Sequence, residues 1–323
     1  MVKHLYDKFH IVAVISNPIR YQSRWRLYRE FEARIKKLGV NMITVELQQG
    51  HRAFQITEAN NISHLQFRTL DELWLKESLI NRGIHHLTRT WPDWKYCAWI
   101  DADVQFMRDD IIDETINQLQ HYHVVQMFET AVDLGPTGQS LATHQSFMSQ
   151  YIKGKPYCYG GARGKYYQLF HPGFAWAATR YAIESMGGLA GPLFDTSILG
   201  AGDGVIAHAL IGMAKETLAQ GLHPNYIQSV LNFEKRVERL IRRDVGFVNG
   251  TLLHYFHGKK RDRGYHSRWQ ILVKNQFDPL NDLERDSAGL YKLADHGDLR
   301  SIRLRDDIRR YLRSRNEDST DLE

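Results

Sequence analysis

Apolar segments of strand length alternate with amphipathic segments of helix length through the first hundred residues. The apolar, β-branched run Phe9–Ser16 is typical of a strand buried on both faces. Large apolar residues recur at helical spacing over Tyr21–Leu38, and a second helix is expected over Leu70–Ile84. Further strands are expected at Val40–Leu47 and Tyr96–Ile100. The order strand, helix, strand, helix, strand predicts an α/β fold with a mostly parallel, doubly wound, Rossmann-like sheet.

The remainder of the chain continues this alternation with one interruption. The segment Ala131–Lys165 is rich in Gly, Ser, Thr, Gln and Tyr, so we interpret it as a functional loop region or an insertion in the sheet. The C-terminal segment is expected to be helical and charged. Helices are further predicted over Asp110–Tyr122, Arg180–Met186 and Val205–Ala219, and strands at Gly173–Ala178 and Gly250–Phe256.

Composition excludes several protein classes. Of the 323 residues, 43% are hydrophobic and 24% are charged, which excludes disordered and coiled-coil chains. The chain lacks the roughly 18 consecutive apolar residues of a membrane span, and Met1–His10 lacks the apolar run of a signal peptide, so a soluble, cytoplasmic protein is expected. Cys97 and Cys158 allow at most one disulfide, and reduced thiols are expected. The net charge of +5 favours anionic ligands in general.

Two carboxylates follow the strand predicted at Tyr96–Ile100. Asp101 and Asp103 lie at its C-terminal end, where open α/β sheets bind their ligands. The apolar residues around them make two adjacent negative charges costly unless a cation neutralises them. A hard divalent ion shared with a diphosphate would do so. The alternative interpretation is an exposed turn with two solvated aspartates.

A late histidine can complete such a site. The run from Leu252 to Lys260 reads LLHYFHGKK, in which a predicted strand ends in His, followed by Gly and two lysines. It would offer an imidazole to a metal ion and ammonium groups to phosphates. Together with the two aspartates, either His254 or His257 gives a plausible Mn²⁺ or Mg²⁺ site. The alternative is a structural histidine in the core or on the surface.

Five motifs occur in an order that resembles the nucleotide-sugar-dependent glycosyltransferases of GT-A fold. They extend over most of the first 265 residues. We accordingly expect a GT-A-like domain over residues 1–265, with a nucleotide-sugar half at about 1–110, an acceptor half at about 111–265, and a charged helical extension at 266–323. The motifs are SNP at 16–18, KE at 76–77 with NRG at 81–83, IDAD at 100–103, HPGF at 171–174 with GAGD at 200–203, and HYFHGKK at 254–260.

The resemblance implies roles for individual residues on the donor side. Asp103 is expected to be the principal metal ligand, and Asp101 to bind the metal or the donor ribose. Cations after the late histidines, which include Lys259 and Arg263, would lie beside the diphosphate and neutralise the leaving group, or could form a solvated basic loop. Residues expected to line the nucleotide are Asn17, Arg20, Lys76 and Asn81, of which Arg20 and Lys76 have an alternative role as solvated helix cations.

Other residues are expected on the acceptor side. Asp203 could take the proton of the acceptor hydroxyl as general base, or could be the N-cap of a helix, and the two roles are compatible. His171 and Trp176 could form an acceptor platform, although a tryptophan that fills the core is an equal alternative. The acid pair that the family often carries at the base position is absent, because Asp203 stands alone among glycines.

The resemblance implies an enzyme that transfers a hexosyl or pentosyl group from a nucleotide sugar, expected to be a UDP-sugar, to a hydroxyl acceptor, with Mn²⁺ or Mg²⁺ as cofactor. A second hypothesis makes DNA the acceptor, through hydroxymethylated bases. The segment Ser301–Arg315 carries six arginines that could follow a phosphate backbone, or could lie on the wet face of an amphipathic helix. A third hypothesis is a non-catalytic module that binds nucleotides or nucleic acid.

Overall fold

A seven-stranded sheet forms the centre of the protein. The computed structural model describes residues 3–155, 170–187, 191–265 and 267–322. Neighbouring strands in the sheet are parallel except around β10, which runs antiparallel to both of its neighbours. The prediction of an α/β fold with a mostly parallel sheet is therefore confirmed. In spatial order the strands are Val245–Phe247 (β11), Val124–Gln126 (β6), Ala175–Thr179 (β10), Tyr96–Ile100 (β4), Phe9–Ser16 (β1), Asn41–Gln49 (β2) and His64–Thr69 (β3).

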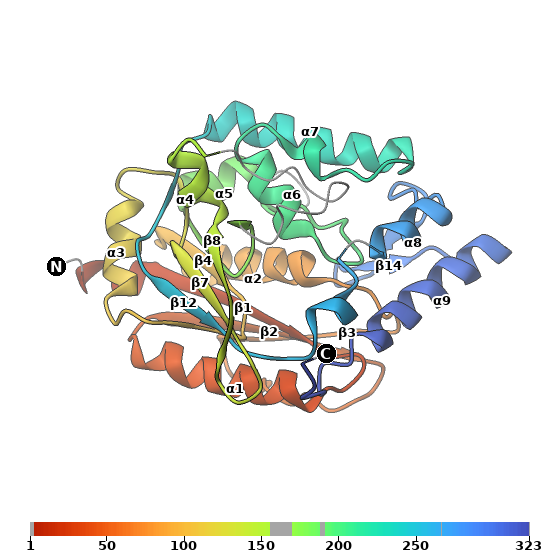
Figure 1. Ribbon diagram of the computed structural model, residues 1–323, viewed down its shortest axis with the longest axis horizontal. Coiled ribbons are helices and arrows are strands. Elements are labelled where there is room, and N and C mark those ends of the chain that lie inside the picture. Colours follow the sequence, from red (N-terminus) through yellow and green to blue (C-terminus); the bar gives the residue numbers. More distant parts are fainter. Residues whose placement is uncertain (1–2, 156–169, 188–190, 266, 323) are drawn as a thin grey trace.

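Helices cover both faces of this sheet (Figure 1). Alternate residues of β1 enter different cores, because side chains of a strand point to opposite faces. Ile11 packs in the core that includes helices Gln22–Lys37 (α1) and Ile111–Gln118 (α3). Val12 packs in the other core, which receives Lys76–Thr90 (α2), Arg180–Gly187 (α5), Gly202–Ala209 (α6) and Pro224–Ile241 (α7). The sheet is thus doubly wound, as predicted.

A second sheet extends from the carboxyl end of the first. Strand β12 lies between β5 and β7, antiparallel to β5 and parallel to β7. In this register His254 is opposite both Val104 and Asp133. Residues far apart in the chain therefore meet beside the end of β4. The strands are Val104–Phe106 (β5), Thr251–His254 (β12), Thr130–Leu134 (β7), Ser140–Ser146 (β8) and Phe170–His171 (β9).

The C-terminal segment shares the core of the main sheet. Trp269 and Leu304 belong to the same buried cluster as Val12 and Val45. The segment contains the helices Arg268–Lys274 (α8) and Leu299–Ser314 (α9), and between them the hairpin strands Leu283–Arg285 (β13) and Tyr291–Leu293 (β14). The last described residues return to the start of α1 (Figure 1). None of the described helices is both long and apolar enough to cross a bilayer.

Several predicted elements differ from those observed. The helix expected over Leu70–Ile84 begins only at Lys76, and the segment before it passes the carboxyl end of the sheet. The helix expected over Val205–Ala219 is wrong as a single element, because α6 ends at Ala209 and Gly212 has a φ of +74°, which a continuing helix does not tolerate. A short 3₁₀ turn follows at Ala214–Thr217.

The interpretation of Ala131–Lys165 as a loop region is corrected in its described part. That part contains most of β7, all of β8 and the helix Phe147–Ile152 (α4). Polar side chains on one face of β8 hid the strand from the hydrophobic pattern. The remainder, including Cys158, falls outside the described residues, and Cys97 is buried.

Candidate functional site

The site lies where the direction of the strand order reverses. From β1 the chain adds β2 on one side and β4 on the other, so the carboxyl ends of β1 and β4 form a topological switch point. Polar residues that follow these two strands meet there. Open α/β sheets bind ligands at such a crevice because the loops diverge above it.

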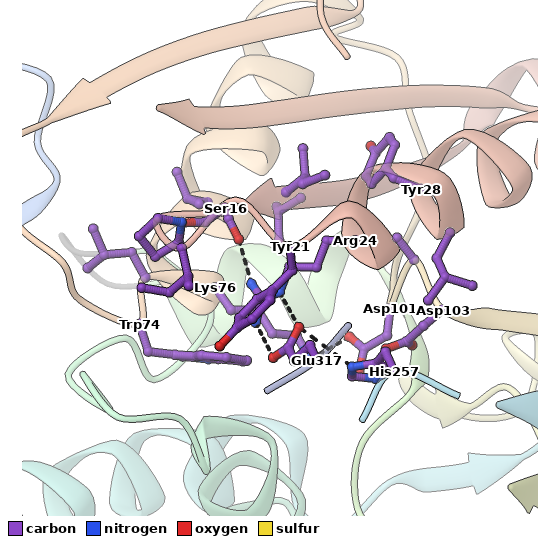
Figure 2. Close-up of a pocket in the computed structure, with 18 of the residues that line it drawn as sticks. Ser16, Tyr21, Arg24, Tyr28, Trp74, Lys76, Asp101, Asp103, His257 and Glu317 are labelled. Atoms are coloured by element: carbon purple, nitrogen blue, oxygen red, sulfur yellow. Dashed lines mark hydrogen bonds and ion pairs between the residues drawn. The ribbon is translucent and has the colours of Figure 1, made fainter. Parts of the chain in front are cut away.

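A cavity opens at this point (Figure 2). With the solvent at its mouth it has an empty volume of about 1040 Å³. Aromatic and aliphatic side chains form most of the wall, and charged groups gather at one end. Its lining includes Ser16, Pro18, Ile19, Tyr21, Arg24, Tyr28, Trp74, Lys76, Asp101, Asp103, His257, Leu312, Arg315 and Glu317.

At the charged end, Asp103 lies beside two histidines. Its Oδ2 atom is 2.8 Å from His257 Nε2 and 3.7 Å from His254 Nε2. One ligand atom from each residue lies within 4.8 Å of those of the other two. Both histidines that the sequence offered as alternatives therefore reach the same point as Asp103.

Each histidine has a carboxylate beside its other ring nitrogen. His254 Nδ1 is 2.7 Å from Asp133 Oδ1, and His257 Nδ1 is 3.7 Å from Glu317 Oε2. A carboxylate in this position would hold the Nδ1 proton of a histidine whose Nε2 binds a cation. Asp133 also accepts hydrogen bonds from the side chains of His144 and Lys260, and its own geometry is fixed by them.

These residues fit a divalent cation. Asp103 Oδ1 is buried and has no hydrogen-bond partner in the described part of the chain, although an unpaired buried oxygen is costly. Burial disfavours the ionised carboxylate, but the charges and hydrogen bonds of His254 and His257 outweigh burial and hold the pKa of Asp103 well below its usual value. One carboxylate and two imidazoles suit Mn²⁺, and suit Mg²⁺ less well because it prefers oxygen ligands.

Asp101, the other carboxylate of the pair, has a different partner. Lys76, the first residue of α2, places its Nζ 2.5 Å from Asp101 Oδ1. Burial raises the pKa of Asp101, and the Lys76 charge opposes that rise. Burial lowers the pKa of Lys76, but Asp101 and Asp203 raise it more, so the ammonium group keeps its proton. The chain itself therefore supplies the cation for Asp101.

Asp203 and Glu77 lie behind this ion pair, around a small second cavity that Lys76, Asp101 and Trp176 also line. Helix α6 begins at Gly202 after Ala201, so Asp203 lies in its first turn and the N-cap interpretation is wrong. The Asp203 side chain accepts a local hydrogen bond from the Gly204 amide at 3.0 Å. Its carboxylate lies at the small cavity, where its charge also acts on Lys76.

Glu77 is a buried acid that the sequence reasoning did not select. Burial raises its pKa to about 8, with Lys76 opposing the rise. A Cβ atom added to Gly202 would lie 2.5 Å from the Glu77 carboxyl carbon, so glycine makes room for this side chain. At neutral pH Glu77 is therefore mostly protonated in the folded protein.

Three residues predicted to line the nucleotide are not part of the cavity wall. Asn17 is buried and exchanges two hydrogen bonds with the backbone of Tyr21. Asn81 is buried too and pairs with the backbone of Leu193. Arg20 is exposed and has a φ of +69° in the turn after β1. Ser16, Pro18 and Ile19 line the cavity instead. A role of Asn17, Asn81 and Arg20 in nucleotide binding stays a prediction.

His171 and Trp176, the two residues predicted to form an acceptor platform, lie in different surroundings. Trp176 is buried, stacks on Trp99 and donates its indole N–H to Pro172, and it also forms a wall of the small cavity near Asp203. The His171 ring stacks on Phe174 at 3.7 Å, and the Phe174 ring in turn contacts His254. His171 thus supports the metal-binding side.

The basic residues after His257 are largely engaged. The Arg263 guanidinium is 3.1 Å from His257 Nε2 and donates to the Tyr265 hydroxyl. Lys259 is nine-tenths buried and lies 3.6 Å from the Asp321 carboxylate. Arg263 is therefore adjacent to the cluster of Asp103, His254 and His257, and its contact with a diphosphate stays a prediction.

The arginines of α9 have intramolecular partners. Arg309 and Arg313 pair with Glu72, Arg310 with Asp307, and Arg303 with Asn275. Arg315 turns inward to Glu317. Nothing in this arrangement favours a DNA acceptor, which stays a prediction.

Several functional candidates were missed from the sequence. Asp133 and Glu317 lie behind the histidines, and Trp74, Arg24 and Arg315 line the cavity, with Arg315 4.8 Å from the centre of the Trp74 ring. None of them belongs to a recognisable motif. Their roles depend on contacts across up to 293 residues of sequence, which no local pattern reveals.

Comparisons with known proteins give matches among solved structures. No protein-family model matches it, and no curated protein is significantly similar. Among solved structures it is similar to the catalytic domain of Drosophila β1,4-galactosyltransferase 7, with 14% identity and a TM-score of 0.31, covering 62% of this chain and 59% of that domain. It is also similar to a Desulfovibrio desulfuricans protein assigned as a nucleotide-diphospho-sugar transferase, with 11% identity and a TM-score of 0.31. The match covers 94% of this chain and 98% of that chain. A glycosyltransferase involved in glycosylation of the PBCV-1 major capsid gives 10% identity over 93% of this chain and 98% of its own, with a TM-score of 0.26.

Proposed function

We propose that this protein is a metal-dependent glycosyltransferase that uses a nucleotide-sugar donor, with a UDP-sugar as the first candidate. One observation carries the proposal. At the charged end of the cavity stand two carboxylate-backed histidines and a carboxylate with a buried oxygen that has no hydrogen-bond partner among the described residues. That combination suits a cation that binds a diphosphate, with the nucleoside in the apolar part.

Asp103, His254 and His257 would hold the cation, and the fit of their donor atoms is described above. When bound, a divalent cation neutralises the charge that develops on the departing nucleoside diphosphate. Arg263, next to His257, adds a positive charge to the same region. The chain thus places its cations where the leaving group would accumulate negative charge.

The nucleoside would occupy the wall of aromatic and aliphatic residues. Trp74 and Tyr21 lie on this wall, and Ser16 Oγ is buried there without a hydrogen-bond partner among the described residues. An apolar wall with few polar groups is typical of sites that bind a planar base and orient it by a small number of hydrogen bonds.

Asp203 would act as the general base. In the proposed step the acceptor hydroxyl oxygen forms a bond to the anomeric carbon, and the bond from that carbon to the diphosphate oxygen breaks. The bonding pair leaves with the diphosphate, and the hydroxyl proton passes to the Asp203 carboxylate. Trp176 is buried in the wall of the same small cavity, and DNA as acceptor has no supporting contact among the described residues.

The direct test measures thermal stability with UDP, GDP, CMP and TDP and their common sugar conjugates, each with and without Mn²⁺. We expect one nucleotide family to raise the unfolding temperature only when Mn²⁺ is present, because ligands that bind the folded state stabilise it. Release of the nucleoside diphosphate from the matching sugar donor would then establish turnover. A folded protein that responds to no nucleotide with any metal would contradict the proposal and favour a non-catalytic module.

A further inference from the structure

The end of α9 and the residues after it, which we call the 312–318 segment, lie against the start of α1. The Tyr21 hydroxyl accepts the Asn316 amide at 3.1 Å and donates to the carbonyl oxygen of Arg313 at 3.0 Å. The Asp318 carboxylate accepts the amides of the first two residues of α1 at 2.8 and 2.7 Å, and such amides have no partner within a helix. The segment is thus fixed beside the cavity, and the residues that it adds to the cavity wall are Leu312, Arg315 and Glu317.

Gly258 makes the close approach of this segment possible. A Cβ atom there would lie 2.7 Å from the Asn316 carbonyl oxygen and 3.0 Å from the Glu317 Cα, and its φ is +81°. Only a residue without a side chain permits this contact between the two backbones. Packing of the main chain therefore brings Glu317 to the loop that carries His257.

The completely buried Glu317 carboxylate holds two arginines together (Figure 2). Arg24 donates to both of its oxygens, from Nε at 2.5 Å and from Nη2 at 2.7 Å. Arg315 donates from Nε at 2.6 Å. Because paired hydrogen bonds between a guanidinium group and a carboxylate fix their relative geometry, both guanidinium groups have defined positions at the cavity wall.

These two arginines lie between the aromatic wall of the cavity and the proposed cation ligands. The guanidinium carbon of Arg315 is 4.8 Å from the centre of the Trp74 ring, and that of Arg24 is 5.7 Å from it. On the other side, the carboxylate that they share is 3.7 Å from His257 Nδ1. A nucleotide with its base on the apolar wall and its diphosphate at the cation would pass these arginines.

The charges of this region favour an anion. Burial disfavours the ionised form of Glu317, but the charges of Arg24 and Arg315 outweigh burial and hold its pKa well below the usual value. The group that is linked through His257 contains two carboxylates, those of Asp103 and Glu317, and three guanidinium groups, since Arg263 also contacts the histidine. A buried excess of positive charge is costly unless a negative group compensates it.

Both arginines keep N–H groups for a ligand. A guanidinium group has five N–H donors. Arg24 uses three of them in its bonds to Glu317 and to the carbonyl oxygen of Ser16. Arg315 uses two, toward Glu317 and the Tyr311 hydroxyl. Among the contacts of the described residues, donors therefore remain on both side chains, and a guanidinium group is well suited to phosphate oxygens.

We propose that Arg24 and Arg315 bind the phosphate groups of the donor, and that Glu317 is the positioning residue that holds both at the cavity wall. The inference rests on the proposed function, since it concerns the same donor. The 312–318 segment then completes the donor site, although the sequence placed it in an extension beyond the catalytic domain.

The first test measures binding of labelled pyrophosphate to the full chain by equilibrium dialysis with saturating Mn²⁺. Pyrophosphate has the phosphate groups of a nucleoside diphosphate without the base, so the donor need not be known. We expect Arg24→Gln and Arg315→Gln each to weaken its binding about 10- to 100-fold, because each loses charged hydrogen bonds. Arg313→Gln is the matched control and should change the affinity less than twofold. The Arg313 side chain is 53% exposed, pairs with Glu72, and is not among the described residues that line the cavity.

The affinity for Mn²⁺ alone, measured by electron paramagnetic resonance, separates phosphate binding from a structural role. It should not fall in Arg24→Gln or Arg315→Gln, because the proposed cation ligands are other residues. An equal loss of Mn²⁺ and pyrophosphate affinity would show that the arginines only maintain the structure of the site, which overturns the inference. Unchanged pyrophosphate affinity in either variant would remove that arginine from the donor site.

A double variant keeps the test decisive if Arg315→Gln alone does not fold. Arg315→Gln combined with Glu317→Gln removes both charges of one buried ion pair, so no unpaired carboxylate remains. We still expect pyrophosphate binding to weaken about tenfold or more, and an unchanged affinity would overturn the inference. Failure of the unaltered protein to bind Mn²⁺ and pyrophosphate would instead contradict the proposed function, whereas normal binding that the arginine variants do not alter would contradict only this inference.

Discussion

The two aspartates that follow β4 are two residues apart, yet their surroundings differ in kind. Asp101 faces Lys76, with Glu77 and Asp203 behind it, and we call these four residues the lysine side. Asp103 faces His254 and His257, and we call these three residues the histidine side. The first carboxylate is neutralised by Lys76, whereas Oδ1 of the second has no hydrogen-bond partner among the described residues and the second lies beside two histidines.

Because of this difference, we expect the two aspartates to have different roles in the proposed site. A metal shared equally by both aspartates would weaken the buried ion pair between Asp101 and Lys76. The arrangement favours an ion held on the histidine side and a fixed ammonium group on the lysine side. Two adjacent carboxylates then avoid mutual repulsion by turning to different cations.

The largest effect is expected for Asp103→Asn. Because this change removes the only charged ligand of the histidine side, Mn²⁺ binding should be lost and the rate of sugar transfer should fall about a thousandfold. Asp101→Asn should retain most of the Mn²⁺ affinity, since Asp101 is paired with Lys76. Equilibrium dialysis with Mn²⁺ checks both variants. Equal loss in the two would remove the distinction between the sides.

Lys76→Met removes the ammonium group of the lysine side and leaves the residues of the histidine side unchanged. It leaves the Asp101 carboxylate unpaired near two further acids, so the free energy of unfolding should drop by about 3 kcal/mol. Urea unfolding measures this change. Addition of Asp101→Asn should restore at least half of the loss, because the unpaired charge is then gone. Lys153→Met, which opens a more exposed ion pair with Glu129, should cost less than about 1 kcal/mol.

Asp203→Asn tests the role of Asp203 within the lysine side. If this carboxylate accepts the acceptor proton, transfer should slow about a hundredfold while the affinities for nucleotide and Mn²⁺ stay the same. Steady-state kinetics together with calorimetric titration of the nucleotide separate the two quantities. A large loss of Mn²⁺ affinity in Asp203→Asn would move this residue to the histidine side.

The smallest effect concerns the pH dependence of stability. The pKa of Glu77 is raised by burial to about 8 from an unfolded value of 4.5, so the folded protein retains a proton that the unfolded chain has lost. Its contribution is fully present below pH 4.5 and declines as the pH rises to about 8. Between pH 6 and pH 8 the loss should be about 2 kcal/mol.

Glu77→Gln mimics the protonated acid and should remove this part of the pH dependence. Urea unfolding at both pH values measures it, with the exposed Glu184→Gln as a control that should keep the slope of the unaltered protein. A slope that is unchanged in Glu77→Gln would show that Glu77 is ionised in the folded protein throughout this range.

Sequence patterns predicted the central strands β1 and β4 better than the edge strand β3 and the helix α7. Strands β1 and β4 match their predicted bounds, because fully buried strands consist of uninterrupted apolar residues. Strand β3 was missed, since its sequence HLQFRT is polar and it lies at the edge of the sheet. Helix α7 was missed although its apolar residues are well spaced.

The candidate site was predictable only where chemistry is concentrated in short motifs. Asp103, His254 and His257 were selected because carboxylates and imidazoles follow predicted strands, and the structure brings them together. Asp133 and Glu317 could not be selected in this way, because their roles arise from strand register and from packing of a distant segment. Position in a pattern indicates the ligands of a site, whereas the residues that orient those ligands depend on tertiary contacts.

The register of β12 has a consequence for how the protein acquires its activity. His254 meets Asp133 only in the observed pairing, and a slip of one residue would turn Leu253 or Tyr255 toward the site. The proposed cation site therefore requires this strand pairing, because Asp103, His254 and His257 come from segments far apart in the chain. Affinity for Mn²⁺ should accordingly appear at the end of refolding, and would serve as a readout of correct strand pairing in newly made protein.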